Sequence, residues 1–262
     1  MKSSKTALIT GASSGIGLEF AKIHAAQGDN LVLVARNKSR LDMLKAELEK
    51  DHGISVYTIG KDLAVADAAQ EVFDETVQQK IWIDYLINNA GFGDFGMFYE
   101  TDWEKEAKMI RLNITTLTRF CKLYIKEMIK RGEGKIMNVA STAAFQPGPT
   151  MAVYYATKAY VLHFSEAINN EVCDKGITVT ALCPGATESG FQAAAAMEDS
   201  KLVKEKKLPS SKEVAQYGYK AMMKGKTVAI HGFKNRLLVS SVRITPRAAV
   251  VKLVRNLQNK AE

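Results

Sequence analysis

The chain has 262 residues, of which 47% are hydrophobic and 24% are charged, with a formal net charge of +8. This composition is typical of an ordinary globular protein, and no apolar run approaches the roughly 18–20 residues of a membrane span. Three cysteines, Cys121, Cys173 and Cys183, lack metal-ligand spacing, so we expect reduced core residues of a cytoplasmic protein with no metal site.

Segments rich in β-branched and aliphatic residues alternate along the chain with amphipathic segments. Strands are predicted near residues 6–10, 31–36, 56–61, 83–89, 134–140, 177–183 and 227–231. Helices are predicted near residues 15–27, 39–50, 67–79, 103–130, 153–174 and 211–223. Gly28 fits a helix C-terminal cap, and Ser210 with Glu213 resembles a capping box. The alternation predicts an α/β fold, a single doubly wound parallel sheet of about seven strands with helices on both faces.

The first predicted strand runs into a glycine-rich turn and then into a helix. The turn reads Thr10-Gly11-Ala-Ser13-Ser14-Gly15-Ile16-Gly17, a Gly-x-x-x-Gly-x-Gly spacing that differs from the common G-x-G-x-x-G fingerprint. Glycines let the backbone approach a pyrophosphate, and a helix N-terminus offers free N–H groups and positive potential. The turn therefore predicts a dinucleotide phosphate site, with an ordinary strand-to-helix turn as the alternative.

The end of the second predicted strand indicates which dinucleotide is preferred. NAD-specific sites place a carboxylate about 20 residues after the glycines, on the ribose 2′-hydroxyl. This chain has Arg36 there, nineteen residues after Gly17, and a guanidinium can bind a 2′-phosphate with bidentate geometry. We therefore expect NADP(H), to whose phosphate Ser13 could add a hydroxyl. A solvated arginine at a helix start is the alternative.

A Ser…Tyr-x-x-x-Lys spacing is the most informative feature of the chain. Tyr154 follows Ser141 by thirteen residues and precedes Lys158 by four. On a helix, positions four residues apart share a face, so the Lys158 ammonium group is expected beside the Tyr154 phenol. A nearby cation lowers the pKa of a phenol from about 10, which suits proton transfer in a carbonyl–alcohol interconversion. A buried tyrosine above a lysine that reaches solvent is the alternative.

Together these motifs resemble those of the short-chain dehydrogenase/reductase family, over about residues 5–232. Five segments occur in the family's order: Thr10–Gly17, Asp62-Leu63, Asn88-Asn89-Ala90-Gly91, the tetrad Asn113, Ser141, Tyr154 and Lys158, and Pro184-Gly185-Ala-Thr187. The resemblance implies one Rossmann-like domain over residues 1–262, with its core at 5–232. It also implies cofactor contacts, beyond the glycine turn, from Asp62, Leu63, Asn89, Ala90, Gly91, Tyr154, Lys158, Pro184, Gly185 and Thr187.

The resemblance also implies a role for each tetrad residue. Tyr154 is the general acid in reduction and the base in oxidation, and Lys158 lowers its pKa and holds ribose hydroxyls. Ser141 donates to the substrate oxygen, and Asn113 positions a water that links Lys158 to solvent. Alternatively, Ser141 satisfies local backbone at a strand end, and Asn113 is a solvated or bend-forming residue in a helix.

Three segments are expected to line the substrate pocket, namely residues 92–98, residues 145–151 and the helix-prone stretch after Thr187. Their apolar members are Phe92, Phe95, Phe145, Met151, Phe191 and Met197. They favour an apolar ketone or aldehyde, such as a steroid-like, aromatic or 3-oxoacyl compound, although several could be core or dimer contacts. We expect a homodimer or homotetramer. An NADP-binding redox sensor on the same fold is the alternative function, and no motif supports a nucleic-acid partner.

The end of the chain is strongly basic. Residues 233–262 carry seven lysines and arginines against Glu262, a net charge of +6. One helical face is expected to carry Val250, Leu253, Val254 and Leu257. A basic amphipathic helix can lie on an anionic membrane surface or bind an acidic partner. Alternatively, its apolar face docks on the body or on a second subunit.

Overall fold

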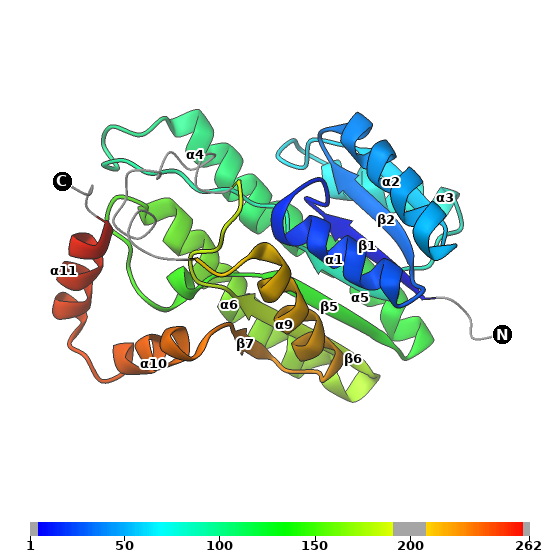
Figure 1. Ribbon diagram of the computed structural model, residues 1–262. Coiled ribbons are helices and arrows are strands. Elements are labelled where there is room, and N and C mark those ends of the chain that lie inside the picture. Colours follow the sequence, from blue (N-terminus) through cyan, green and yellow to red (C-terminus); the bar gives the residue numbers. More distant parts are fainter. Residues whose placement is uncertain (1–4, 191–207, 259–262) are drawn as a thin grey trace.

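The computed structural model of the protein describes residues 5–190 and 208–258. At its centre lies a seven-stranded sheet in the order β3-β2-β1-β4-β5-β6-β7, in which every neighbouring pair is parallel (Figure 1). The strands are β1 Thr6–Thr10, β2 Asn30–Ala35, β3 Val56–Gly60, β4 Tyr85–Asn88, β5 Gly134–Val139, β6 Ile177–Cys183 and β7 Val228–Ile230. The predicted parallel sheet is confirmed.

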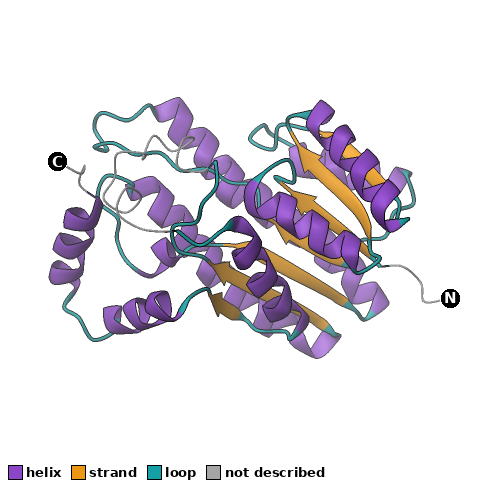
Figure 2. Ribbon diagram, in the orientation of Figure 1, coloured by secondary structure: helices purple, strands orange, loops and turns teal. Residues whose placement is uncertain are grey.

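Helices cover both faces of the sheet (Figure 2). One face carries α1, α2 and α9, around a core that includes Phe20, Leu41 and Val214. The other carries α3, α5 and α6, around a core that includes Phe120 and Val161. These helices are α1 Gly15–Ala26, α2 Lys38–His52, α3 Ala68–Gln78, α5 Leu117–Arg131, α6 Ala152–Val172 and α9 Ser211–Met223. Strands covered on both sides need apolar residues at almost every position, which explains their nearly continuous hydrophobic runs.

The two predicted helix caps are confirmed. Gly28 follows the C-cap of α1 with a φ of 82°, a conformation that glycine adopts without strain. Ser210 and Glu213 form a reciprocal capping box at the start of α9.

The predicted helix over residues 103–130 is not continuous. It consists of α4 Trp103–Ile110, a π-helical segment η1 Arg111–Thr116 and α5. Such π-helical segments are rare and often occur at functional sites. The segment contains Asn113, so the interruption lies at one of the predicted site residues.

The C-terminal segment forms two short helices, α10 Phe233–Val242 and α11 Arg247–Gln258, at the end of the molecule opposite the N-terminus (Figure 1). The α11 helix docks on the body through Val250 and Val254. The predicted apolar face was wrong in part, because Leu253 is 57% exposed and Leu257 42% exposed. The third inward position is taken by the fully buried Gln258. No helix in the described ranges is long and apolar enough to cross a membrane.

All three cysteines are free thiols. Cys121 and Cys183 are buried in the core as predicted, but Cys173 is exposed. The prediction failed there because α6 ends at Val172, its last buried position, and Cys173 begins the surface 3-10 turn η3 Cys173–Lys175.

Candidate active site

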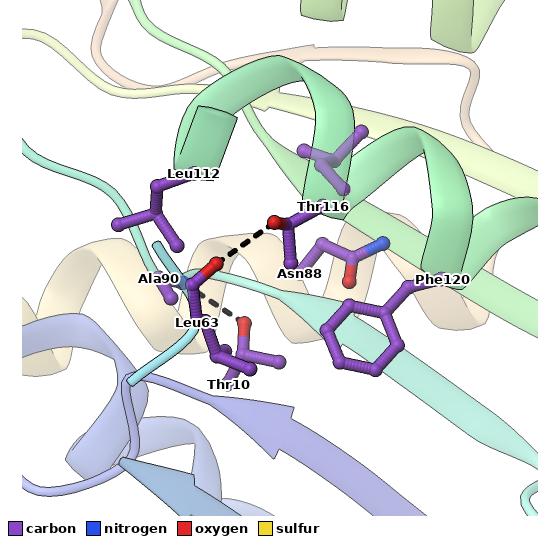
Figure 3. A pocket seen from close by; sticks show the side chains of 8 residues that line it. Thr10, Leu63, Asn88, Ala90, Leu112, Thr116 and Phe120 are labelled. Carbon is purple, nitrogen blue, oxygen red and sulfur yellow. Dashed lines mark hydrogen bonds between the residues drawn. The ribbon is translucent and has the colours of Figure 1, made fainter. Parts of the chain in front are cut away.

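The carboxyl ends of β1 and β4 meet where the strand order reverses, which is the usual ligand crevice of doubly wound sheets. The side-chain amide of Asn89 donates to the Thr10 carbonyl at 2.9 Å. The backbone N–H groups of Asn89 and Ala90 donate to the Thr10 hydroxyl at 3.0 and 2.9 Å. Figure 3 shows the side chains of Thr10, Leu63 and Ala90, which line a small cavity. These bonds fix the start of the glycine turn.

The glycine turn passes so close to the Asn89 side chain that it leaves no room for larger residues. A Cβ on Gly17 would clash with the Gly11 carbonyl and would lie 2.5 Å from the Asn89 amide nitrogen. The N-cap of α1, Ser14, makes no side-chain capping hydrogen bond, and the first turn of α1 contains no acidic residue. Along this turn Ser14 is exposed, and the half-buried residues are Gly11, Ser13, Gly15 and Ile16. The turn therefore presents backbone and a helix N-terminus to a ligand.

Three further predicted residues lie at the same edge of the sheet, one after β2 and two after β3. Arg36 is exposed directly after β2. Asp62 is exposed after β3 and accepts the Ala64 N–H at 2.9 Å. Leu63 is buried, and its carbonyl accepts the Thr116 hydroxyl at 2.8 Å (Figure 3). Because the strands are parallel, these residues share the edge that carries the glycine turn.

Ser141 and Tyr154 are joined by a hydrogen bond between the end of β5 and the first turn of α6. This bond lowers the pKa of Tyr154, but burial has the larger effect and raises the pKa well above its usual range. The Ser141 hydroxyl also accepts the Ala143 N–H at 3.1 Å and donates to the Pro184 carbonyl at 3.4 Å. Both the local backbone contact and the contact with Tyr154 are therefore present.

Lys158 lies one helical turn beyond Tyr154, as the spacing predicted. Its Nζ is 5.8 Å from the centre of the Tyr154 ring and donates to the Val139 carbonyl at 2.7 Å. Burial lowers the pKa of Lys158 to about 8. A pKa of Tyr154 below its usual value, as predicted, is wrong for this structure, because burial raises the pKa of the phenol more than its neighbours lower it.

Asn113 is 1% exposed and connects the π-helical segment to α6 and to the loop that follows β4. Its Nδ2 donates to the Phe92 carbonyl at 3.0 Å and to the Thr157 hydroxyl at 3.1 Å. Its Oδ1 accepts the Phe92 N–H at 3.3 Å. A Cβ on Gly91 would lie 2.9 Å from that oxygen and 3.6 Å from the Lys158 Nζ, so Asn113 and Lys158 flank the same glycine.

Residues after β6 form the next part of this edge. Pro184 is buried, and its carbonyl accepts the Thr142 N–H at 2.9 Å. The Thr187 hydroxyl donates to the Gly185 carbonyl at 3.0 Å. The side chain of Asn235, on α10, packs against Gly185, where an added Cβ would lie 2.6 Å from its amide nitrogen. Sequence analysis missed Asn235, because no local motif marks it.

An apolar cluster lies beside Tyr154. It contains Met109, Ala143, Met151, Tyr154, Tyr155, Val250 and Val254, with Phe92, Phe95, Val153 and Val242 packed against it. Phe92, Phe95 and Met151 are therefore on the Tyr154 side, as expected. Phe145 packs against the sheet core instead. Phe191 and Met197 lie outside the described residues, as does the rest of the stretch 191–207.

The C-terminal helix reaches this cluster through Gln258. Its Nε2 donates to the Tyr155 hydroxyl at 2.6 Å, and its Oε1 accepts the Thr150 hydroxyl at 3.3 Å. Gln258 thus ties α11 to both the start of α6 and the loop before it. Sequence analysis missed this contact because its two ends are 103 residues apart and share no motif.

Comparison with known proteins identifies the class. A family model described as short chain dehydrogenase matches residues 5–200. The chain therefore belongs to the short-chain dehydrogenase/reductase family of oxidoreductases, which use nicotinamide cofactors. The resemblance found in the motifs is confirmed.

Among curated relatives, the chain is 35% identical over 177 residues to a very-long-chain 3-oxoacyl-CoA reductase of Pyrenophora tritici-repentis, covering 66% of this chain and 52% of that protein. The chain thus spans about half the length of this relative. A solved short-chain dehydrogenase from Sphingobium yanoikuyae in complex with NADPH has a TM-score of 0.82 and 33% identity, covering 92% of this chain and 94% of that one. A bulky-bulky ketone specific alcohol dehydrogenase from Comamonas testosteroni has a TM-score of 0.78 and 32% identity, covering 92% of both chains.

Proposed function

We propose that the protein is an NADP(H)-dependent oxidoreductase that interconverts an apolar ketone or aldehyde and its alcohol. The observation that carries this proposal is the arrangement of Ser141, Tyr154 and Lys158, in which two hydroxyls share a hydrogen bond and a buried ammonium group lies one turn away. Family membership supports the reaction class. We also propose that residues 1–262 form one domain, with residues 233–262 as an extension of its core.

NADP(H) fits the residues at the carboxyl edge of the sheet. The tight turn at Gly17 and the α1 N-terminus, free of acidic side chains, suit a pyrophosphate. The exposed guanidinium of Arg36 suits a 2′-phosphate. Other residues proposed to hold the cofactor are Gly11, Ser13, Ser14, Gly15, Ile16, Asp62, Leu63, Asn89, Ala90, Gly91, Tyr154, Lys158, Pro184, Gly185 and Thr187. When bound, the nicotinamide supplies or accepts the hydride.

Within this proposal, Tyr154 moves the proton. A phenol is protonated at neutral pH, and burial raises the pKa of Tyr154 further, so it is in the form needed to donate a proton to a carbonyl oxygen during reduction. Ser141 already holds the Tyr154 hydroxyl, and it can donate to the same substrate oxygen when its own proton turns away from the Pro184 carbonyl. Lys158, with a pKa of about 8, stays largely charged at pH 7 and can stabilise the phenolate that remains after transfer. Asn113 holds the backbone of Phe92, and the adjoining Gly91 lies between Asn113 and Lys158.

The surroundings of Tyr154 support the proposed substrate class. Apolar side chains, including Phe92, Phe95 and Met151, dominate the cluster beside it. The solved relative from Comamonas testosteroni is specific for bulky ketones, and the curated relative is a 3-oxoacyl-CoA reductase. These likenesses support an apolar carbonyl compound. We also propose that the protein forms a homodimer or homotetramer. We further propose that it is located in the cytoplasm, a reducing compartment with which the three free thiols agree.

One assay tests the proposal. Purified protein is incubated with NADPH or NADH and a panel of bulky ketones, aldehydes and 3-oxoacyl thioesters. Oxidation of the nucleotide is followed by the loss of absorbance of its reduced nicotinamide. We expect turnover with NADPH and at least one bulky ketone or 3-oxoacyl thioester. Tight NADPH binding without turnover on any member of the panel would favour a redox sensor instead.

A further inference from the structure

The outer side of α10 is apolar, although it faces away from the body. Its inward positions are Asn235, Val239 and Val242, which follow the i, i+4, i+7 spacing of one face. On the opposite side, Phe233 is 74% exposed and Leu237 63% exposed. Leu238 on the flank is 60% exposed, and Ile244, just after the helix, is 87% exposed. The α11 helix adds the exposed side chains of Leu253 and Leu257. Single exposed apolar residues are common, but six on one short segment are not.

The same segment is basic throughout. Residues 233–258 contain no aspartate or glutamate and six basic residues, namely Lys234, Arg236, Arg243, Arg247, Lys252 and Arg255. All six are exposed, and no ion pair is found for any of them within the described part of the chain. They account for most of the net charge of +8 of the whole protein.

We propose that α10 and α11 attach the protein to an anionic lipid bilayer surface. Exposed apolar side chains can enter the boundary between headgroups and acyl chains, while the surrounding lysines and arginines pair with anionic headgroups. Each cation near such a surface strengthens attachment about fivefold. A second copy of this chain is the less suitable occupant, because a twofold contact through this surface would bring two sets of six exposed cations together. This proposal goes beyond the proposed redox function and does not depend on it.

Vesicle co-sedimentation of the full chain tests the attachment. The vesicles are phosphatidylcholine alone, or phosphatidylcholine with an equal part of phosphatidylglycerol, at about 50 and 500 mM NaCl to vary the screening. We expect binding to the anionic vesicles at low salt, little binding to neutral vesicles, and at least a tenfold loss of affinity at high salt.

Two double variants separate the contributions. Leu237→Ser with Leu253→Ser removes exposed apolar contacts, and Arg243→Glu with Lys252→Glu reverses two charges. Each should weaken binding to anionic vesicles at least tenfold. Matched controls at exposed positions of other helices are Met43→Ser with Val77→Ser, and Lys122→Glu with Lys126→Glu. Both controls should bind as the unmodified protein does, and all variants should keep its melting temperature.

Three results would overturn the proposal. The first is no binding of the unmodified protein to anionic vesicles at low salt. The second is equal weakening by the matched control variants, which would show that the position of the lost apolar or basic side chains does not matter. The third is loss of self-association in the α10 and α11 variants, measured by light scattering, without any change in vesicle binding. That result would assign the surface to a second copy of the chain.

Discussion

The two ends of the crevice are built in different ways. At the glycine-turn end, Thr10 and Asn89 hold the backbone of two neighbouring strands through short side chains. At the Tyr154 end, side chains from distant segments hold one another, and Gln258 binds a residue 103 positions earlier in the chain. The first end is determined by the order of the strands. The second depends on how the helices around it pack.

The electrostatics of the two ends differ for the same reason. The glycine-turn end has an exposed Arg36 and an uncapped helix N-terminus, where a ligand can meet charge in contact with solvent. At the Tyr154 end, burial raises the pKa of Tyr154 and lowers the pKa of Lys158, so both side chains are driven toward their neutral forms. Changes at the first end should therefore alter binding, and changes at the second should alter proton transfer and stability.

Replacing Tyr154 tests this division most severely. Tyr154→Phe removes the proposed proton donor and little volume, so we expect kcat to fall by about 10²–10⁴-fold. NADPH affinity, measured by fluorescence titration, should stay close to that of the unmodified protein. Tyr155→Phe is the matched control and should lower kcat no more than several-fold. An active Tyr154→Phe with an inactive Tyr155→Phe would mean that the wrong tyrosine has been assigned the proton.

Lys158 should show the cost of a buried charge. Its pKa falls from 10.5 to about 8 on folding, so the unfolded chain binds more protons between those two pH values. Stability therefore rises with pH through this window, and the cost of the charge is fully present below pH 8. Lys158→Met removes that cost but also a hydrogen bond to the Val139 carbonyl. We therefore expect the free energy of unfolding to rise by about 1–3 kcal/mol at pH 7.

Denaturant unfolding of Lys158→Met at several pH values measures the effect. The gain should shrink as the pH rises from 8 toward 10.5, while turnover is lost at every pH. Lys122→Met, at an exposed position of α5, is the control and should show no such dependence on pH. A gain that is constant with pH would contradict the assignment of the buried charge to Lys158.

Sequence reasoning succeeded where local chemistry determines the structure. The strands were predictable because apolar runs covered on both faces leave a clear pattern, and Tyr154 and Lys158 were placed together by helical periodicity alone. It failed where packing decides. The weak helix formers around Asn113 do not by themselves indicate a π-helical segment. The rotation of α11 about its axis determines whether Leu253 or Gln258 is buried against the rest of the protein. The hydrogen bond between Gln258 and Tyr155, which the sequence does not predict, accompanies burial of Gln258.

Arg36 tests the solvent-facing end. Arg36→Asp replaces the proposed 2′-phosphate partner by a carboxylate, which repels that phosphate and can accept the 2′-hydroxyl of NADH. A partly exposed charged hydrogen bond is worth about 1.5–3 kcal/mol, so the ratio of kcat/KM for NADPH over NADH should fall about tenfold or more. Turnover with NADH should persist, since Tyr154 is unaffected. Arg40→Asp, four residues further along the chain, is the control and should leave the ratio of kcat/KM for the two nucleotides close to that of the unmodified protein. Equal use of both nucleotides by the unmodified protein would contradict the assignment.

Replacing Gln258 should have the smallest effect on turnover, and it tests most directly whether α11 supports the Tyr154 end of the crevice. Gln258→Leu leaves the buried Tyr155 hydroxyl without its partner, at a cost of about 1–2 kcal/mol in the free energy of unfolding. Because Tyr155 adjoins Tyr154, we expect kcat to fall several-fold while KM for NADPH is unchanged. Adding Tyr155→Phe removes the second polar group, so the double variant should recover part of the stability lost. Gln216→Leu, on the exposed side of α9, is the control. If the double variant were destabilised by the sum of the two single variants, the two residues would act independently and α11 would not support the Tyr154 end.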